Sequence, residues 1–431
     1  MILLRGGRVV DPASGTDQTL DVLIDGDVIA EVGEGLKPAT AEVVDCAGAV
    51  VAPGFVDLHV HFREPGGEEA ETIQTGSRAA ALGGFVAVCP MPNTNPAQDS
   101  ASVVEFVWRR GREVGLVDVF PIGAITSGRA GAELSPMREM HASAARVRMF
   151  SDDGDPVPTA LLLRRALEYA KAFDGVIVEH AEDPSLRSGQ MHEGSVSALL
   201  GLRGLPAESE EICVHRDLAL ARLTGSRLHI AHVSTSGAVD AIRRAKASGV
   251  KVTCEVTPHH LALTDEAVKS FDPGFKVAPP LRSQEHVDAL KAAVADGTID
   301  AVATDHAPHA MHTKDREFEY APCGMVGLET ALGVVGAELV EPGICALGRV
   351  VELLSRGPAR ILGSDEHGGP IAAGRPANLV VFDAEATWMV DPSGLASRSR
   401  NTPFIGRKLR GRVVHTILRG RFTVKEGEIA S

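Results

Sequence analysis

Residues 51–62 read VAPGFVDLHVHF, and this stretch determines how the rest of the chain is interpreted. Its strand-like run, Gly54–Phe62, is apolar and carries two histidines near its end. Ala- and Leu-rich stretches with helical spacing, such as Thr159–Phe173 and Gly237–Ala247, separate most of the later apolar runs. Those seven later runs are Phe85–Pro90, Val117–Ile125, Val147–Ser151, Val176–Ala181, Leu228–Ser234, Val250–Thr257 and Ile299–Ala307. Eight such strand–helix repeats predict an α/β fold of the (β/α)8 (TIM) barrel type.

An open, doubly wound sheet is the alternative architecture. It is disfavoured because no GxGxxG turn follows the first run, and because polar groups occur at nearly every strand end.

Both ends of the chain differ from this middle region. They contain short β-prone runs separated by turn residues: Leu20–Ile24, Val28–Val32, Glu42–Asp45, Asn378–Asp383, Thr387–Val390 and Val413–Arg419. Chain termini often lie close together in space. We therefore expect residues 1–52 and 363–431 to form one small β domain and residues 53–362 to form the barrel.

Composition restricts the class of protein. The chain has 431 residues, 43 of them basic and 57 acidic, for a net charge of −14, which argues against nucleic-acid binding. The six cysteines form no CxxC pair, which argues against a disulfide scaffold or a thiolate zinc finger. No apolar run approaches the roughly 20 residues that span a bilayer, and the apolar stretch before Arg5 is too short for a signal peptide. These features predict a cytoplasmic enzyme with a small-molecule substrate.

Polar side chains follow the predicted strands. In a barrel of this type the catalytic groups lie at the C-terminal ends of the strands. The residues at those ends are His59 and His61, Asn93, Asp152 and Asp153, His180, His232, His259 and His260, and the segment Asp305–His309.

The spacing of His59 and His61 suits a shared metal ion. Residues i and i+2 of a strand point to the same face, so both imidazoles aim into the barrel mouth. His229, three residues before His232, faces the other way and is interpreted as a core or helix-facing residue. A single strand histidine is usually structural, but histidines and aspartates at so many strand ends predict a metal centre. Mixed imidazole and carboxylate ligands suit zinc, with manganese, cobalt and iron as alternatives.

Five short motifs stand out along the chain. They are Asp57–Gly66 (DLHVHFREPG), Pro90–Thr94 (PMPNT), Asp305–His309 (DHAPH), Gly324–Thr330 (GMVGLET) and Gly374–Leu379 (GRPANL). With these motifs the chain resembles the amidohydrolase superfamily and, within it, the longer, bacterial-type (type I) dihydroorotases. The HxH pair alone occurs throughout the superfamily, whereas HFREPG and PMPNT together are far more specific.

The resemblance implies a two-zinc site. His59, His61 and Asp305 would bind one ion, and His180 and His232 the other. Many relatives bridge the two ions with a carboxylated lysine, but this chain has only Arg146 and Arg148 near that position. An aspartate would replace the lysine, and we predict Asp153, with Asp152 as the alternative. Adjacent strand residues point to opposite faces, so we expect only one of the two to reach the metal.

The resemblance also implies substrate contacts. Arg63 would offer a planar fork to a carboxylate. The other implied contacts are His61, Asn93, Ala278, His309, Cys323 and Gly324. Ala278 stands where many relatives carry an asparagine, which removes one expected hydrogen bond. A nucleophilic role for Cys323 is disfavoured because no base is evident beside it.

The implied reaction is the reversible cyclisation of N-carbamoyl-L-aspartate to L-dihydroorotate in pyrimidine biosynthesis, with Asp305 carrying the proton. The nearest alternative is an allantoinase or hydantoinase, which would not need Arg63. A non-catalytic homologue that scaffolds aspartate transcarbamoylase would have lost metal ligands, and this chain retains them. A nucleobase deaminase is disfavoured by the strand-four carboxylate and the Arg63–Asn93 pair. The expected assembly is a homo-oligomer, with aspartate transcarbamoylase as a candidate partner.

Overall fold

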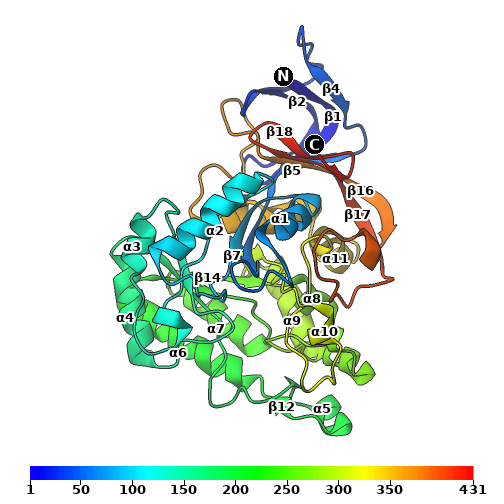
Figure 1. Ribbon diagram of the computed structural model, residues 1–431. Helices are drawn as coiled ribbons and strands as arrows, with labels where there is room; N and C mark the ends of the chain where they lie inside the picture. The colour runs from blue at the N-terminus through cyan, green and yellow to red at the C-terminus, as the bar shows by residue number, and fades with distance from the viewer. Residues whose placement is uncertain (431) are drawn as a thin grey trace.

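The computed structural model describes residues 1–430 and has two visibly different parts (Figure 1). One is a barrel of parallel strands with helices around it. The other is a twisted sheet that contains both chain termini, drawn in blue and red at the top of the view.

The barrel strands are β6 (Phe55–Val60), β7 (Phe85–Pro90), β8 (Asp118–Val119), β9 (Met149–Ser151), β10 (Val176–Glu179), β13 (Arg227–Ile230), β14 (Val252–Val256) and β15 (Ala301–Val302). They pair in parallel as β6–β7–β8 and as β9–β10–β13–β14–β15. Single parallel bridges, Gly123 to Phe150 and Val60 to His306, close the ring between these two sets. The predicted (β/α)8 barrel and its eight strand runs are confirmed.

Several strands are shorter than the apolar runs that predicted them. The eighth run extends from Ile299 to Ala307, but β15 ends at Val302. The Thr304 N–H donates to the side chain of Asp57, 3.1 Å from Oδ1, and not to a neighbouring strand. Backbone pairing with β6 resumes at His306, whose carbonyl accepts the His61 N–H at 2.8 Å.

The main helices around the barrel are α1 (Ile73–Leu82), α2 (Ala101–Val114), α4 (Ala160–Lys171), α6 (Glu208–Thr224), α7 (Ser236–Ala247), α9 (Gln284–Ala295), α12 (Leu347–Leu354) and α13 (Arg356–Leu362). Shorter helices are α3 (Met137–Ala142), α5 (Ser195–Leu200), α8 (Pro258–Ala262), α10 (Met311–Lys314) and α11 (Ala331–Val335). Threonine caps begin α1, α4 and α7, where the hydroxyl accepts a backbone N–H that has no partner within the helix. Helix α4 buries Leu163, Ala166, Leu167 and Ala170, the three- and four-residue spacing of one helical face.

The terminal sheet has nine strands in the order β19–β18–β17–β16–β5–β1–β2–β3, with β4 also paired to β1. The strands are β1 (Ile2–Asp11), β2 (Thr16–Asp25), β3 (Val28–Gly33), β4 (Glu42–Asp45), β5 (Val50–Pro53), β16 (Leu379–Met389), β17 (Lys408–Leu418), β18 (Arg421–Lys425) and β19 (Glu428–Ile429). The pairing of β5 with β16 joins the two ends of the chain. Strand β1 was not predicted; it contains the apolar residues that open the chain.

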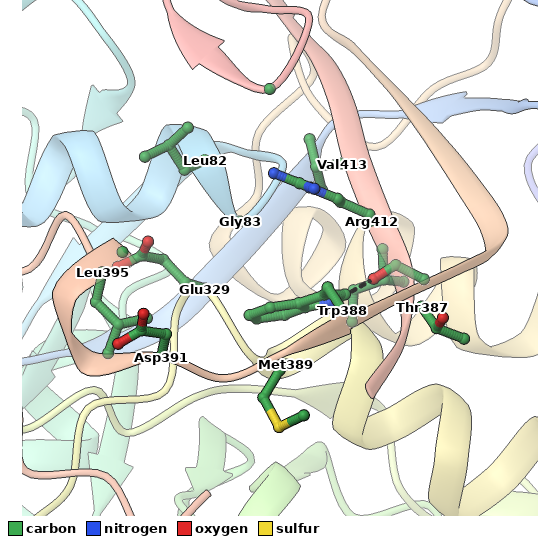
Figure 2. Close-up of a pocket in the computed structure, with 14 residues that line it drawn as sticks. Leu82, Gly83, Glu329, Thr387, Trp388, Met389, Asp391, Leu395, Arg412 and Val413 are labelled. Carbon is green, nitrogen blue, oxygen red and sulfur yellow. Dashed lines mark hydrogen bonds between the residues drawn. The ribbon is translucent and has the colours of Figure 1, made fainter. Parts of the chain in front are cut away.

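The sheet connects to the barrel through Gly54, which alone separates β5 from β6. A Cβ at Gly54 would lie 2.4 Å from Val86 Cγ1, so a larger residue would push the first two barrel strands apart. A cavity of about 460 Å³ lies where the sheet meets the barrel, and Leu82, Glu329, Trp388 and Arg412 are among its lining residues (Figure 2). Within residues 1–430, no helix is long and apolar enough to cross a membrane.

Candidate metal centre

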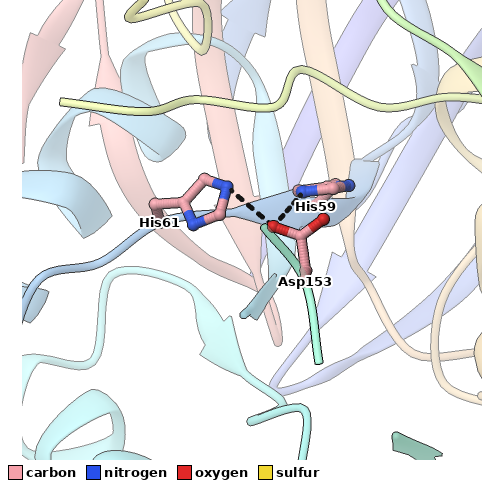
Figure 3. Close-up of side chains that lie close together, drawn as sticks. All are labelled: His59, His61 and Asp153. Atoms are coloured by element: carbon pink, nitrogen blue, oxygen red, sulfur yellow. Dashed lines mark ion pairs between the residues drawn. The ribbon is translucent and has the colours of Figure 1, made fainter. Parts of the chain in front are cut away.

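Asp153 lies among four histidines at the C-terminal end of the barrel strands. Its Oδ2 lies 3.4 Å from His59 Nε2 and 3.5 Å from His61 Nε2 (Figure 3). Its Oδ1 lies 3.3 Å from His232 Nε2 and 3.4 Å from His180 Nδ1. One carboxylate therefore faces two histidine pairs from opposite sides of the barrel.

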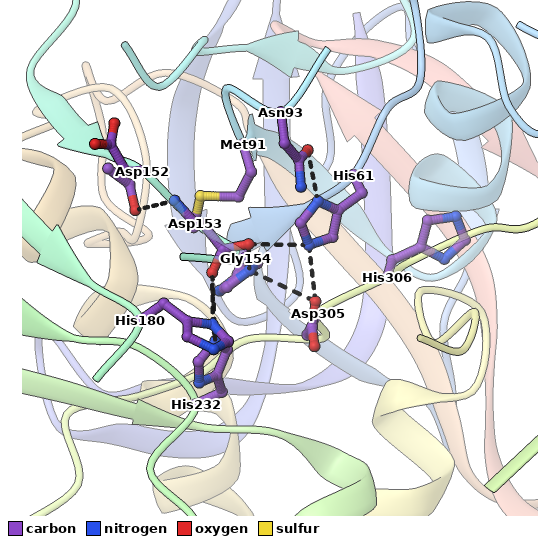
Figure 4. A network of polar contacts seen from close by, with 12 residues as sticks. His61, Met91, Asn93, Asp152, Asp153, Gly154, His180, His232, Asp305 and His306 are labelled. Carbon is purple, nitrogen blue, oxygen red and sulfur yellow. Dashed lines mark hydrogen bonds and ion pairs between the residues drawn. The ribbon is translucent and has the colours of Figure 1, made fainter. Parts of the chain in front are cut away.

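Asp305 completes the arrangement from the last strand. Its Oδ1 lies 3.0 Å from His61 Nε2 and 3.5 Å from His59 Nε2 (Figure 4). Asp305 and His232 both have positive φ, +47° and +31°, which non-glycine residues rarely adopt. Strained backbone of this kind clusters at functional sites, where surrounding structure must hold it in place.

The charges around the site favour a positive group at its centre. Burial alone would raise the pKa of Asp153, but His59, His180 and His232 outweigh burial and hold it well below its usual range. Burial would also raise the pKa of Asp305, and the neighbouring histidines again hold it below its ordinary value. Conversely, burial would lower the pKa of His180, but Asp153 and Glu182 raise it to about 9. Two ionised carboxylates thus face imidazole nitrogens in a buried pocket.

These residues fit a metal ion. His59 Nε2 is buried and has no hydrogen-bond partner among residues 1–430, although two carboxylates lie within 3.5 Å of it. The ligand atoms of His59, His61 and Asp153 lie within 4.8 Å of one another, and so do those of Asp153, His180 and His232. Asp153 belongs to both groups, and nitrogen and oxygen donors in such a set are those that zinc prefers.

Asp152 points elsewhere. Its Oδ1 accepts hydrogen bonds from the backbone N–H groups of Ile125 and Thr126 at 2.9 and 3.0 Å, and its Oδ2 accepts from Thr126 Oγ1. Asp152 therefore anchors the segment after β8, while Asp153 faces the histidines.

Three carboxylates behind these histidines were not predicted from the sequence. Glu255 accepts from His59 Nδ1 at 2.9 Å and also contacts His229 Nε2 at 3.1 Å. Glu182 lies 2.8 Å from His180 Nε2 and Glu71 lies 3.2 Å from His306 Nε2. Such carboxylates fix the orientation of an imidazole ring. Glu255 had a sequence signal, a charged residue within the apolar strand VTCEV (Val252–Val256), because unpaired charge is rarely buried.

Arg63 and Asn93 lie beside the histidines. Arg63 Nε donates to Pro308 O at 3.1 Å, and the guanidinium forms no salt bridge with any carboxylate in residues 1–430. Its terminal nitrogens are therefore not engaged by a protein carboxylate. His61 Nδ1 lies 3.0 Å from Asn93 Oδ1, a contact that leaves the Asn93 amide hydrogens for another partner.

The remaining predicted substrate contacts lie on three loops, which contain His309, Cys323 with Gly324, and Ala278. His309 Nε2 donates to Cys323 O at 2.7 Å, and burial beside Arg63 lowers the pKa of His309 to about 3, so its ring is neutral at ordinary pH. The backbone N–H of Gly324 donates to Lys276 O at 2.8 Å. Ala278 follows two residues after Lys276 and is partly buried, and Cys323 is exposed.

Comparison with known structures identifies the class of protein. The L-hydantoinase (dihydropyrimidinase) of Arthrobacter aurescens superposes with a TM-score of 0.89 at 26% identity, covering 100% of this chain and 97% of that one. A D-hydantoinase from a Bacillus species, strain AR9, superposes with a TM-score of 0.87 at 26% identity, covering 100% and 96%. Fold and site together define a hydrolase of the amidohydrolase type, acting on the carbon–nitrogen bonds of cyclic amides.

Sequence relatives identify the family. A family model described as Dihydro-orotase-like matches residues 48–238. The dihydroorotase of Streptomyces coelicolor is 54% identical over 428 residues, and that of Mycobacterium tuberculosis is 51% identical over 430 residues, each match covering 99% of both chains. The chain belongs to the dihydroorotase family, and the resemblance inferred from its motifs is confirmed.

Proposed function

We propose that this protein is a dihydroorotase that uses two zinc ions to interconvert L-dihydroorotate and N-carbamoyl-L-aspartate in pyrimidine biosynthesis. The observation that carries the proposal is the position of Asp153 between two histidine pairs, with the unpaired Arg63 fork beside them. The first feature suits metal-assisted hydrolysis, and the second suits a substrate with a fixed carboxylate.

The proposed ligands divide into two sets that share one residue. His59, His61 and Asp305 would hold one ion, His180 and His232 the other, and Asp153 would contact both. Bound zinc would supply Lewis acidity, which polarises the scissile carbonyl and makes water acidic enough to attack near neutral pH. Glu255 and Glu182 would hold His59 and His180 in the ligating orientation.

Asp305 would carry the proton. Its lowered pKa keeps it ionised, so it can accept a proton from the attacking water. The new carbon–oxygen bond forms first at the ring carbonyl carbon, and the ring carbon–nitrogen bond then breaks as Asp305 returns the proton to the leaving nitrogen. Cyclisation follows the same path in reverse and starts from protonated Asp305, so lower pH favours it and higher pH favours hydrolysis.

The substrate carboxylate would be bound by Arg63 and Asn93. A guanidinium can donate two parallel hydrogen bonds to a carboxylate, and the Asn93 amide can add a third. The neutral ring of His309, together with the backbone at Cys323 and Gly324, would contact the pyrimidine ring.

An assay of the purified protein with dihydroorotate, allantoin and a 5-substituted hydantoin, together with metal analysis, tests the proposal. We expect turnover of dihydroorotate and two zinc ions per chain. Preference for a hydantoin, which has no fixed carboxylate, would instead assign the protein to the hydantoinase type. Failure to turn over any of the three while retaining metal would favour a scaffolding homologue.

The proposal includes the organisation of the protein. Residues 1–52 and 363–431 would form one domain, which the pairing of β5 with β16 supports, and residues 53–362 the other. A cytoplasmic homo-oligomer that binds aspartate transcarbamoylase would fit the family. Analytical ultracentrifugation with and without that enzyme tests both associations.

A further inference from the structure

A segment from the terminal sheet reaches into the barrel mouth. Residues 395–402, here called the connector, lie between β16 and β17. The connector residue Asn401 contacts two barrel loops at once. Its Oδ1 accepts from the His309 N–H at 3.1 Å, and its Nδ2 donates to Ala307 O at 3.0 Å and to Gly324 O at 3.1 Å. Its own backbone carbonyl accepts from the Val326 N–H at 3.0 Å.

The two loops joined by Asn401 carry the proposed substrate contacts. Residues 305–309 hold Asp305 and His309, and residues 323–326 hold Cys323 and Gly324. The loops approach each other closely: a Cβ on Gly324, whose φ is +131°, would lie 2.6 Å from Ala307 Cβ. Within residues 1–430, two hydrogen bonds join the loops directly, His309 Nε2 to Cys323 O and the Ala307 N–H to Met325 O at 2.8 Å. The Asn401 side chain adds three more hydrogen bonds, two to the first loop and one to the second.

The connector itself is anchored to the barrel by the residues that precede Asn401. Ser399 Oγ donates to Ala70 O at 2.7 Å, and the Arg398 N–H donates to the buried carboxylate of Glu71 at 3.0 Å. The carboxylate of Glu329 accepts from the Ala396 N–H at 2.9 Å, and the same Glu329 lines the cavity of Figure 2. Because Asn401 extends from a fixed segment, it can hold the loops in place.

Asparagine suits this position because its amide both accepts and donates. One oxygen accepts the His309 N–H, and one NH₂ group serves two carbonyls. Aspartate would accept the first bond but would place a charge against the Ala307 and Gly324 carbonyls. Alanine would leave all three backbone groups without their partner, and a polar group left unpaired is costly.

We propose that Asn401 is a positioning residue, which holds the loops at 305–309 and 323–326 at the separation needed to bind the ring of the substrate. This inference rests on the proposed function. It makes the terminal sheet a contributor to substrate binding, although Asn401 itself does not ligate the metal centre.

The test compares Asn401→Ala, Asn401→Ser and Asn401→Asp with the parent, all as full-length, metal-loaded protein. Arg400→Ala is the matched control, since Arg400 lies on the same connector and donates to Ser399 O rather than to either loop. We expect the KM for dihydroorotate to rise about tenfold or more in Asn401→Ala and Asn401→Asp, less in Asn401→Ser, with bound metal unchanged. The control should stay within about twofold of the parent.

A purely structural role would give a different kinetic pattern. Partial unfolding reduces the active fraction, which lowers the apparent kcat and leaves KM unchanged. That result, or unchanged kinetics in all three variants, would overturn the inference. If Asn401→Ala does not fold, the KM and kcat of the milder variant Asn401→Ser are compared with those of the parent instead.

Amide hydrogen exchange separates this inference from the proposed function, because it needs no substrate. The His309 N–H donates a hydrogen bond to Asn401 Oδ1. Its hydrogen should exchange about tenfold faster or more in Asn401→Ala than in Arg400→Ala. Equal exchange in the two variants would contradict positioning by Asn401. A parent that exchanges as expected but does not turn over dihydroorotate would instead contradict the proposed function.

Discussion

Two clusters in this protein contain the same kinds of residue and differ in what neutralises them. The mouth cluster consists of His59, His61, Asp153, His180, His232 and Asp305. The base cluster consists of Asp118, Glu366 and His367, whose ligand atoms also lie within 4.8 Å of one another. Asp118 begins β8, so the base cluster lies at the opposite end of the barrel from the mouth.

An arginine neutralises the base cluster. Arg419 donates to both carboxylate oxygens of Asp118 at 2.8 and 2.7 Å and contacts Glu366 Oε2 at 3.2 Å. In the mouth cluster, by contrast, no lysine or arginine of residues 1–430 forms a salt bridge with Asp153 or Asp305. Buried carboxylates require a compensating charge. Histidines and carboxylates in proximity therefore do not by themselves define a metal site. We expect a metal in the mouth cluster, where no lysine or arginine of residues 1–430 pairs with the carboxylates.

The largest expected effect tests this distinction directly. Asp153→Ala should lose bound metal and nearly all activity, because Asp153 faces both histidine pairs. Asp118→Ala, the matched change in the base cluster, should keep its metal. Metal content by mass spectrometry and turnover of dihydroorotate measure both. If Asp118→Ala lost as much metal as Asp153→Ala, the proposed difference between the two clusters would be wrong. If only Asp152→Ala lost metal, the ligand would be Asp152 and not Asp153.

A second change tests proton transfer within the mouth cluster. Asp305→Asn preserves the shape of the side chain but cannot accept a proton. Turnover should fall by about 10²–10⁴-fold in both directions, the usual contribution of a positioned acid–base group. Steady-state kinetics with matched metal content gives the measurement. A folded variant within threefold of the parent would remove Asp305 from the mechanism.

A third change tests Arg63, a cation beside the mouth cluster that forms no salt bridge with a carboxylate of residues 1–430. Arg63→Lys retains the charge and loses the planar fork. The kcat/KM for dihydroorotate should fall more than about tenfold, or roughly 1.4 kcal/mol. The corresponding base change, Arg419→Lys, should leave kcat/KM unchanged. Unchanged kinetics for Arg63→Lys would mean that other groups bind the substrate carboxylate.

The smallest effect concerns stability at the base. Burial would raise the pKa of Asp118, but His367 and Arg419 outweigh it and hold the pKa below its ordinary value of 3.8. An acid whose pKa is lowered by folding stabilises the protein above its unfolded pKa, and this contribution is lost as pH falls through the folded pKa. Asp118→Asn should therefore lower the free energy of unfolding by about 1 kcal/mol at pH 7, with unchanged activity. Urea unfolding at pH 7 and pH 3 checks this, and a difference that does not shrink at pH 3 would rule out ionised Asp118 as the cause.

The sequence predicted the barrel well because each strand carries its own signal. Runs such as Phe85–Pro90 are apolar and β-branched, and that run coincides with β7. Strand ends were less predictable, since β15 stops where Thr304 bonds to Asp57, a residue 247 positions away in the chain. Strand β1 carries a weaker signal, because Arg5, Gly6, Gly7 and Arg8 interrupt its apolar residues.

Some residues of the candidate site could likewise be predicted from the sequence, and others could not. The alternation of side chains along a strand placed His59 and His61 on one face from local geometry alone. The charge within the apolar strand VTCEV marks Glu255 as unusual, but no local rule could pair it with His59, because the two residues meet only when β14 and β6 close into one barrel. Asn401 lies still further from the barrel in sequence, and its contacts with His309 and Gly324 depend on how the connector crosses to the mouth.

The sequence by itself determined the fold class, the family and the residue types available at the mouth, because strand periodicity and short motifs are local properties of the chain. The sequence narrowed the strand-four carboxylate to Asp153 or Asp152 and favoured Asp153, and the tertiary structure places Asp153 against the histidines and Asp152 away from them. Only the tertiary structure decided that Asn401 joins two loops of the mouth. It also decided that Arg419 neutralises the base cluster while no arginine or lysine of residues 1–430 pairs with the mouth carboxylates. These outcomes depend on distances between segments far apart in sequence, and only the closed barrel and its attached sheet set those distances.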